Sequence, residues 1–305
     1  MSFTEQERAL FDLLFDASLR ERFIKNASTA LTEYQLTTEE LADFLVINPH
    51  GLALDANVRV DLILGQWCRT LPLTFSLLSS LKGGLLLLRR LVDSQTMRHA
   101  PIERVVVFAT RLRQALIAEP AVALDELAFI VAILDAELGM ASTGASLKKT
   151  VLMSYYAEPA KAEVSDRWLT QPVTLAANVS AAMIPLSYSR LKKALCPFSG
   201  AELWRYLNKT PLLAAERQRL WSQADSRLLV AKANVSMMSD CEPTIEYATV
   251  ELAEGFASLF EYVNGSMSVQ QILTQLQQMG APESLLQGIK SGFRQLFEAG
   301  MVVCE

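Results

Sequence analysis

The stretch NGSMSVQQILTQLQQMGAPESLLQGIKSGFRQLFEAGMVV, residues 264–303, carries the clearest structural pattern in the chain. Asn264-Gly265 is typical of a helix C-cap, and Ser268 is an N-cap that opens a second helix. A third helix is predicted over Pro282 to Phe297 and ends at Gly300, after which the chain can run back as a strand. The apolar residues of that helix recur at helical spacing, namely Leu285, Ile289, Phe293 and Leu296.

Segments with strand patterns precede these helices. In Thr244 to Val250, one set of side chains (Ile245, Tyr247, Thr249) alternates with another (Thr244, Glu246, Ala248). This period of two is the signature of a half-buried strand. Arg227 to Ala233 is rich in β-forming residues, and shorter strands are predicted at 173–175 and 181–186. A helix predicted over Leu252 to Val263 completes the set. Strands, three helices and a terminal strand are the elements of a winged helix.

The N-terminal half is predicted to be helical. Residues 4–47 indicate short helices, one of them opened by Thr37 with acidic residues in its first turn. From 55 to 138 the apolar residues follow helical periods, and Pro72 stands where a new helix can start. Serine, threonine and two glycines at 139–146 predict a loop that closes this helical region.

These patterns predict an α+β fold that is mostly α. An N-terminal helical bundle is followed by a winged-helix-like domain with a small antiparallel sheet. The length of 305 residues agrees with two or three domains. Three parts are expected: an accessory helical segment at 1–50, a helical bundle domain at 51–168 and the winged-helix-like domain at 169–305.

Composition and charge exclude some classes of partner. The net charge is −5 and Lys and Arg form no cluster, so a nucleic-acid or anionic-membrane surface is not expected. The apolar stretch Leu71 to Leu88 is interrupted by Pro72, Lys82 and Gly83-Gly84, which makes it too broken for a membrane span. Acidic residues near the start argue against a signal peptide. The sequence therefore predicts a cytoplasmic protein without membrane contact.

Residues with metal-binding or catalytic chemistry are few. The chain has two histidines, His50 and His99, and four scattered cysteines: Cys68, Cys196, Cys241 and Cys304. None stands at a recognised ligand spacing, and no GxSxG, Walker or GxGxxG motif is present. No catalytic, cofactor-binding or metal-binding residue is therefore predicted, and we expect the isolated chain to bind no iron.

The segment Leu252 to Val303 resembles the winged-helix recognition elements that bind precursor peptides in ribosomal peptide modification. The small chaperone of pyrroloquinoline-quinone synthesis is one of these. The matching residues form an apolar helix end, a glycine turn, a capped helix and a final Leu…Gly-apolar-apolar string: Leu259, Val263, Asn264-Gly265, Ser268-Val269, Ile272, Leu276, Leu296, Gly300 and Met301-Val302.

Residues 55–305 are also similar to the partner proteins of multinuclear non-haem iron oxidases, which modify cysteine-containing peptides. The similarity rests on four strings: Asn57-Val58-Arg59-Val60-Asp61, Leu71-Pro72-Leu73-Thr74-Phe75, Lys82-Gly83-Gly84 and Arg227-Leu228-Leu229-Val230. The likeness is best to the partner subunits of the methanobactin and 3-thiaglutamate pathways, and to a DNA-binding family of similar build. Residues 5–47 depart from this pattern and look like the small helical subunit of ring-opening dioxygenases.

The resemblance implies a non-catalytic partner subunit in a heterodimer with an iron-dependent oxidase, and the iron would belong to that oxidase. The subunit would bind the leader of a ribosomally made precursor peptide and present it for cysteine modification. If 227–236 is an edge strand, an extended leader can add to it, and its cationic flank favours an acidic leader. The residues expected to bind the peptide are Arg227, Leu228, Leu229, Val230, Ala231, Lys232, Leu286, Lys290 and Phe293.

Three alternatives accompany this interpretation. Residues 227–236 are equally compatible with an internal strand that is already paired on both sides. The same winged helix also fits a DNA-binding regulator, although the third helix holds only Lys290 and Arg294 against Glu283. An oxidoreductase would need a ligand set that the sequence does not supply.

Overall fold

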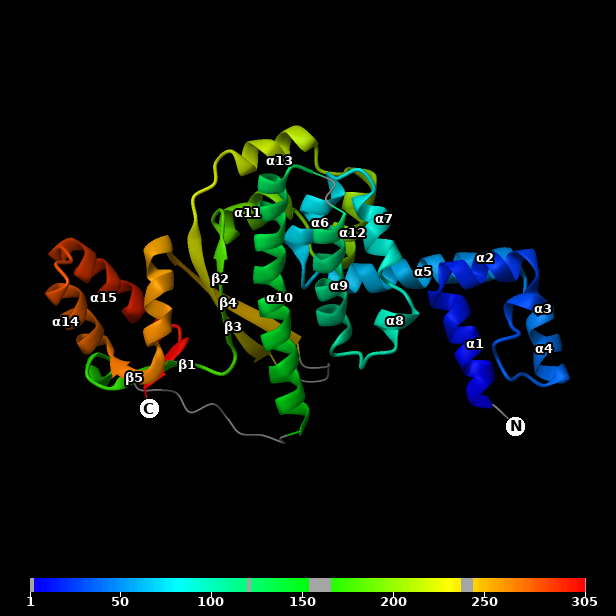
Figure 1. The fold of residues 1–305 in the computed structure, drawn as a ribbon, viewed down its shortest axis with the longest axis horizontal. Helices are drawn as coiled ribbons and strands as arrows, with labels where there is room; N and C mark the ends of the chain where they lie inside the picture. Colours follow the sequence, from blue (N-terminus) through cyan, green and yellow to red (C-terminus); the bar gives the residue numbers. More distant parts are fainter. Residues whose placement is uncertain (1–2, 120–121, 154–165, 237–243, 305) are drawn as a thin grey trace. The chain divides into compact units, whose positions relative to one another are not determined.

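Figure 1 shows the computed structural model, which describes residues 3–119, 122–153, 166–236 and 244–304. The chain is mostly helical and holds two three-stranded antiparallel sheets, which confirms the predicted α+β class. It divides into two compact units, each made of two pieces of the chain. The first contains Met1–Val122 and Leu195–Ala214, and the second contains Ala123–Ala194 and Ala215–Glu305.

Four helices at the start of the first unit enclose a core, to which Leu52 from the next helix also contributes. They are α1 (Phe3–Phe15), α2 (Ala17–Lys25), α3 (Ala27–Ala30) and α4 (Thr38–Leu45). The buried side chains of this core are apolar: Ala9, Leu13, Leu19, Phe23, Ala30, Leu31, Phe44 and Leu52. The predicted cap of α4 is confirmed as a capping box, in which the side chains of Thr37 and Glu40 each accept the other's backbone N–H.

The rest of the first unit is a helical bundle. Its helices are α5 (Pro49–Trp67), α6 (Pro72–Ser79), α7 (Gly84–Arg90), α8 (Ser94–Met97), α9 (Arg104–Ala118) and α12 (Gly200–Lys209). Pro72 opens α6, as predicted, and every residue of α6 is buried.

Helix α12 packs against α5. A Cβ on Gly65 would lie 3.1 Å from the Cβ of Ala201, and the indole N–H of Trp204 donates to the Asp61 carboxylate at 3.1 Å. Residues 195–214 therefore fold with the helical bundle. This differs from the expectation that placed them in a domain at 169–305.

In the second unit, α10 (Leu124–Met153) packs along a sheet and takes the place of the loop predicted at 139–146. A Cβ on Gly144 would lie 2.3 Å from the Tyr247 hydroxyl of the sheet, so this glycine permits close packing. The Tyr247 hydroxyl donates to the Met140 carbonyl at 2.8 Å, and burial raises the pKa of Tyr247 to about 12. The loop prediction was wrong because small residues inside a helix can mark a close neighbour as well as a turn.

Among the described residues, α10 is the one helix long and apolar enough to cross a membrane by length and composition. The span Leu124–Thr150 has a hydropathy of 1.5, and 56% of its most apolar window is buried inside the protein. A core helix passes the same test as a membrane span. The packing of α10 along the sheet accounts for its apolar length.

The sheet that α10 covers has the strand order β2-β3-β4. Its strands are β2 (Val179–Ile184), β3 (Arg227–Ser236) and β4 (Thr244–Ala253), all antiparallel. Between β2 and β3 the second unit also contains α11 (Tyr188–Leu195) and the residues of α13 (Ala214–Trp221). A buried ion pair joins Arg217 of α13 to Glu126 of α10.

The second sheet has the order β5-β1-β6, so its central strand comes from a distant part of the chain. Its strands are β5 (Asn264–Ser268), β1 (Pro172–Leu175) and β6 (Val302–Cys304). Helices α14 (Val269–Gln278) and α15 (Glu283–Glu298) connect β5 to β6, and the predicted cap of α14 at Ser268 is confirmed.

The helix predicted over Leu252 to Val263 is wrong in type. β4 continues to Ala253, and the residues that follow form the 3-10 helix η2 (Glu254–Tyr262). A second 3-10 helix, η1 (Asp166–Leu169), precedes β1. One core joins both sheets to η2, α14 and α15: Trp168, Val173, Leu228, Val230, Leu252, Phe256, Leu259, Val263, Val269, Ile272, Ile289, Phe293, Leu296, Met301 and Val302.

Candidate functional site

The segment predicted to receive a peptide is the central strand of its sheet. β3 pairs along its length with both neighbours, so that Val230 lies opposite Ala181 of β2 and Val250 of β4. The edge-strand interpretation of residues 227–236 is therefore wrong, and the internal-strand alternative is confirmed. Leu228, Leu229, Val230 and Ala231 are buried, because both faces of a central strand are covered.

The residues predicted on α15 do not form one surface. Leu286 and Phe293 are buried in the core, and only Lys290 is exposed. The buried stripe of α15 begins at Leu286 and continues through Ile289, whereas Leu285, which the helical spacing had grouped with Ile289, is half exposed. A peptide on the surface cannot contact Leu286 or Phe293 without displacing core side chains.

The predicted cationic flank is also dispersed. The guanidinium of Arg227 pairs with the Asp225 carboxylate at 2.6 Å. The amine of Lys232 lies 2.6 Å from the place that a Cβ on Gly300 would occupy, so Lys232 is directed toward the end of α15. Lys290 is exposed and forms no ion pair with another residue that the structure describes.

One strand away from the predicted edge, β4 has an outer edge with which no described strand pairs. The N–H of Ala233 on β3 donates to the Asn178 carbonyl beside β2 at 2.9 Å. The backbone groups of Ala233, an odd-numbered residue, thus point toward β2. Because the backbone groups of successive residues point to opposite sides of a strand, the even-numbered residues of β3 form the hydrogen bonds to β4. In the β3–β4 register, Lys232 pairs with Ala248 and Val230 with Val250, so these β4 residues point inward.

The outward-pointing N–H and C=O groups of β4 therefore belong to Ile245, Tyr247, Thr249 and Glu251. Within the part of the chain that the structure describes, no strand pairs with this edge. Unpaired backbone groups on a long edge are a template for another extended chain.

Each face of β4 adjoins a different element. The odd-numbered side chains face α10, since the Tyr247 hydroxyl bonds Met140 of that helix. Of the even-numbered side chains, Leu252 is buried beside Phe256 in the core, whereas Glu246 and Ala248 are exposed. On the even-numbered face, the far end of β4 thus meets an apolar wall, and its beginning is open to solvent.

Helix α15 approaches the end of β4 through a glycine. A Cβ on Gly292 would lie 2.5 Å from the Phe256 ring and 3.4 Å from a methyl of Leu252. One turn earlier on the same side of the helix, a Cβ on Gly288 would meet nothing within 4 Å. Gly292 therefore lets Phe256 and Leu252 pack directly against α15, and the helix has no side chain at Gly288.

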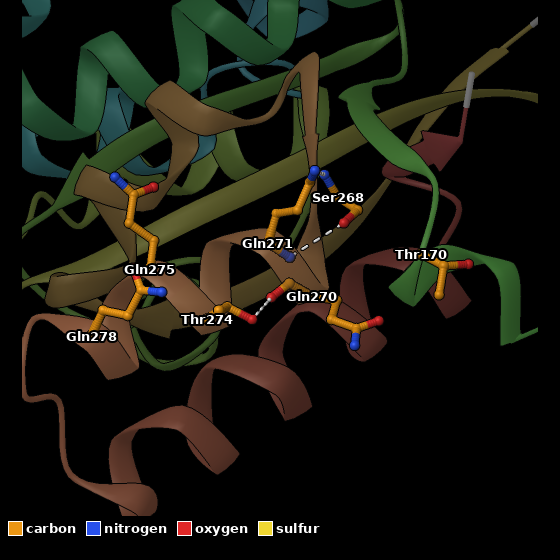
Figure 2. A pocket seen from close by; sticks show the side chains of 7 residues that line it. All are labelled: Thr170, Ser268, Gln270, Gln271, Thr274, Gln275 and Gln278. Atoms are coloured by element: carbon orange, nitrogen blue, oxygen red, sulfur yellow. Dashed lines mark hydrogen bonds between the residues drawn. The ribbon is translucent and has the colours of Figure 1, made fainter.

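A separate hollow of about 640 Å³ lies along α14, as Figure 2 shows. Its lining is polar and uncharged: Thr170, Ser268, Gln270, Gln271, Thr274, Gln275 and Gln278. Gln271 forms the capping box with Ser268, and Thr274 donates to the Gln270 carbonyl at 2.8 Å. This hollow can offer amide hydrogen bonds but no acid, base or nucleophile. The glutamine-rich string of α14 is the sequence signal for it.

Metal-binding residues do not gather in the described ranges, where no group of three or more His, Cys, Asp and Glu side chains could hold an ion. His50 and His99 are both exposed; His50 lies in α5, and His99 lies in the turn that follows α8. Cys68 is buried, Cys196 and Cys304 are half-buried, and Cys241 lies outside the described residues.

Comparison with models of protein families, with curated proteins and with solved structures gave no match.

Proposed function

We propose that this chain is a non-catalytic partner subunit that binds a ribosomally made precursor peptide on β4 and presents it to an iron-dependent peptide-modifying oxidase. The observation that supports the proposal is the free edge of β4, which is ten residues long. An extended peptide adds to such an edge through main-chain hydrogen bonds, and the spaces beside alternate residues select its side chains. The docking strand is thus β4, in place of the segment Arg227 to Lys232.

β4 is better suited to a peptide than the other outer strands. β2 has six residues, β5 has five and β6 has three. The pairing of β5 with β1 is also irregular, which bends the strand. Because each outward residue contributes one donor and one acceptor, β4 can hold the longest peptide segment.

The helices next to this edge support the same kind of function. We propose that α14 and α15, with the strands that flank them, are a winged-helix type of peptide recognition element. The DNA-binding alternative has less support, since α15 exposes only Lys290 and Arg294 as cations, and Arg294 pairs with Glu298 at 2.8 Å. A helix that binds DNA needs several cations free to reach phosphates.

Thr249→Pro is expected to weaken binding of an extended leader peptide by about tenfold, since it removes one hydrogen bond and leaves a peptide carbonyl unpaired. The N–H of Thr249 points away from β3, so proline there leaves the β3–β4 ladder intact. The measurement is fluorescence anisotropy with a labelled leader taken from a short peptide encoded beside this gene. Circular dichroism verifies that the variant is folded.

The matched control is Ala181→Pro, which removes an outward N–H from the opposite edge of the same sheet, on β2. Thr249→Ala retains the N–H and tests the side chain alone. Both controls should bind the leader like the unchanged protein. If Thr249→Pro binds equally well, or if Ala181→Pro loses as much affinity, the peptide does not dock on β4.

A row of exposed aliphatic residues on α5 is proposed as the surface that the oxidase covers. Leu54, Val58 and Leu62 are four residues apart, so they lie on one side of the helix, and all three are exposed. The chain as a whole has a mean hydropathy of +0.22, which also favours covered apolar surface.

Val58→Glu is expected to weaken association with the oxidase by at least about tenfold, because a carboxylate would be buried without a partner. Leu213→Glu is the control, since Leu213 is an exposed aliphatic residue of the same unit outside the α5 row. The complex is measured by analytical ultracentrifugation after co-expression. Equal complex formation by the two variants would place the interface elsewhere.

A further inference from the structure

We infer that the peptide segment bound by β4 is basic, with Lys or Arg at positions beside the glutamates of this strand. The inference rests on the proposed strand addition and specifies the chemistry of its ligand. β4 contains Glu246 and Glu251, and Glu254 follows directly after it. No Lys or Arg occurs in Thr244–Ala253. An added strand would therefore lie beside carboxylates and beside no cation of β4 itself.

These carboxylates are not neutralised by ion pairs within the described residues. Glu246 and Glu254 are exposed. Glu251 accepts a hydrogen bond from the backbone N–H of Ser189 at 2.9 Å, which orients the carboxylate but leaves its charge in place. Glu246 and Glu254 are thus available to a cation on a neighbouring strand, and Glu251 adds its charge from beside the first turn of α11.

The two glutamates within β4 flank the outer edge on opposite faces. Glu251 lies on the face of Tyr247, which is directed at α10. Glu246 lies on the other face, because even and odd residues of a strand alternate. A peptide docked beside β4 would have Glu246 next to one of its faces and Glu251 next to the other, in either strand direction. Basic residues on both faces of the peptide are therefore favoured.

Two cations on the elements beside β4, Lys232 of β3 and Lys290 of α15, are directed away from this edge. Lys232 is a diagonal neighbour of Glu246 in the β3–β4 register, yet its amine extends toward Gly300. On α15, Gly292 marks the side that meets β4. Lys290 is two residues earlier, which at about 3.6 residues per turn places it about 200° around the helix, on the far side. The acidic leader expected from Arg227, Lys232 and Lys290 has no matching surface here.

The test uses two synthetic ten-residue peptides that alternate valine or threonine with a charged residue. They differ only in whether the charged positions carry lysine or glutamate. The lysine peptide is expected to bind the full chain about tenfold more tightly at low ionic strength, since each opposed charge pair across strands contributes modestly. The preference should shrink as salt is added, because the charges are exposed.

Glu246→Lys should reduce the preference for the lysine peptide several-fold, and Glu246→Gln should reduce it by less. Glu216→Lys makes the same change of net charge on exposed α13 and should leave the preference unchanged. Equal binding of both peptides, or tighter binding of the glutamate peptide, would overturn the inference while strand docking remains. If neither peptide binds, or if Thr249→Pro has no effect on the bound one, strand docking itself fails.

Discussion

Arg217→Met is expected to lower the free energy of unfolding by about 3–5 kcal/mol, the range found when one partner of a buried ion pair is removed. Arg217 is 4% exposed and pairs with Glu126, which is 8% exposed. Methionine retains the length and apolar stem of the side chain but leaves the Glu126 carboxylate without its counter-charge. The measurement is urea denaturation followed by circular dichroism.

The double variant Arg217→Met with Glu126→Leu should recover most of the lost stability, because neither charge then remains buried. Arg219→Met serves as the control, since Arg219 lies two residues away on α13 and is exposed. If the double variant is as unstable as Arg217→Met, the loss comes from packing at α13, and the ion pair is not what holds that helix to α10.

Phe293→Ala is expected to cost about 3–5 kcal/mol of stability, as is usual when a large aromatic side chain is removed from a core. Phe293 is 1% exposed, and its ring lies 5.1 Å from that of Phe256, measured between centroids. Thermal and denaturant unfolding of the full chain measure the effect.

Leu285→Ala is the matched control on the same helix. Leu285 is 50% exposed, so its truncation should change stability by less than about 1 kcal/mol. The pair also tests the assignment of Phe293 to the core in place of a peptide-binding surface. A Phe293→Ala variant with unchanged stability and weakened peptide binding would contradict that assignment.

Features that depend on a few neighbouring residues could be predicted from the sequence. The capping boxes at Thr37 and Ser268 are examples, because each needs only a hydroxyl residue and a Glu or Gln three positions later. The limits of α15 followed in the same way from Pro282 and Gly300. These signals are local, so no knowledge of the rest of the fold is required.

Features that depend on a neighbour from elsewhere in the chain could not be predicted in this way. Gly144 resembles a loop residue until Tyr247 is known to lie against it. The exposed edge was placed on β3 because strand patterns do not reveal pairing. The consecutive apolar residues Leu228 to Ala231 were a signal of a central strand, since a strand covered on both faces has no polar side.

Part of the candidate site was therefore one strand away from its predicted position. The sequence pointed to the same sheet and the same helix, α15, that the proposed site uses. It could not assign the edge to β4, because that requires the register in which Lys232 lies opposite Ala248. The charge of the expected peptide changed with the strand, from acidic beside Arg227 to basic beside Glu246.

The position of β1 has a consequence for biosynthesis on the ribosome. Val173 pairs with Cys304, so the middle strand of the β5-β1-β6 sheet is made long before either of its neighbours. The nascent chain must keep this strand unpaired until almost the whole second unit has left the exit tunnel. Contacts between such distant positions raise the contact order and slow folding. A fragment that begins at Glu254 would contain β5 and β6 without the strand that joins them, so this element cannot be excised and grafted as a portable module.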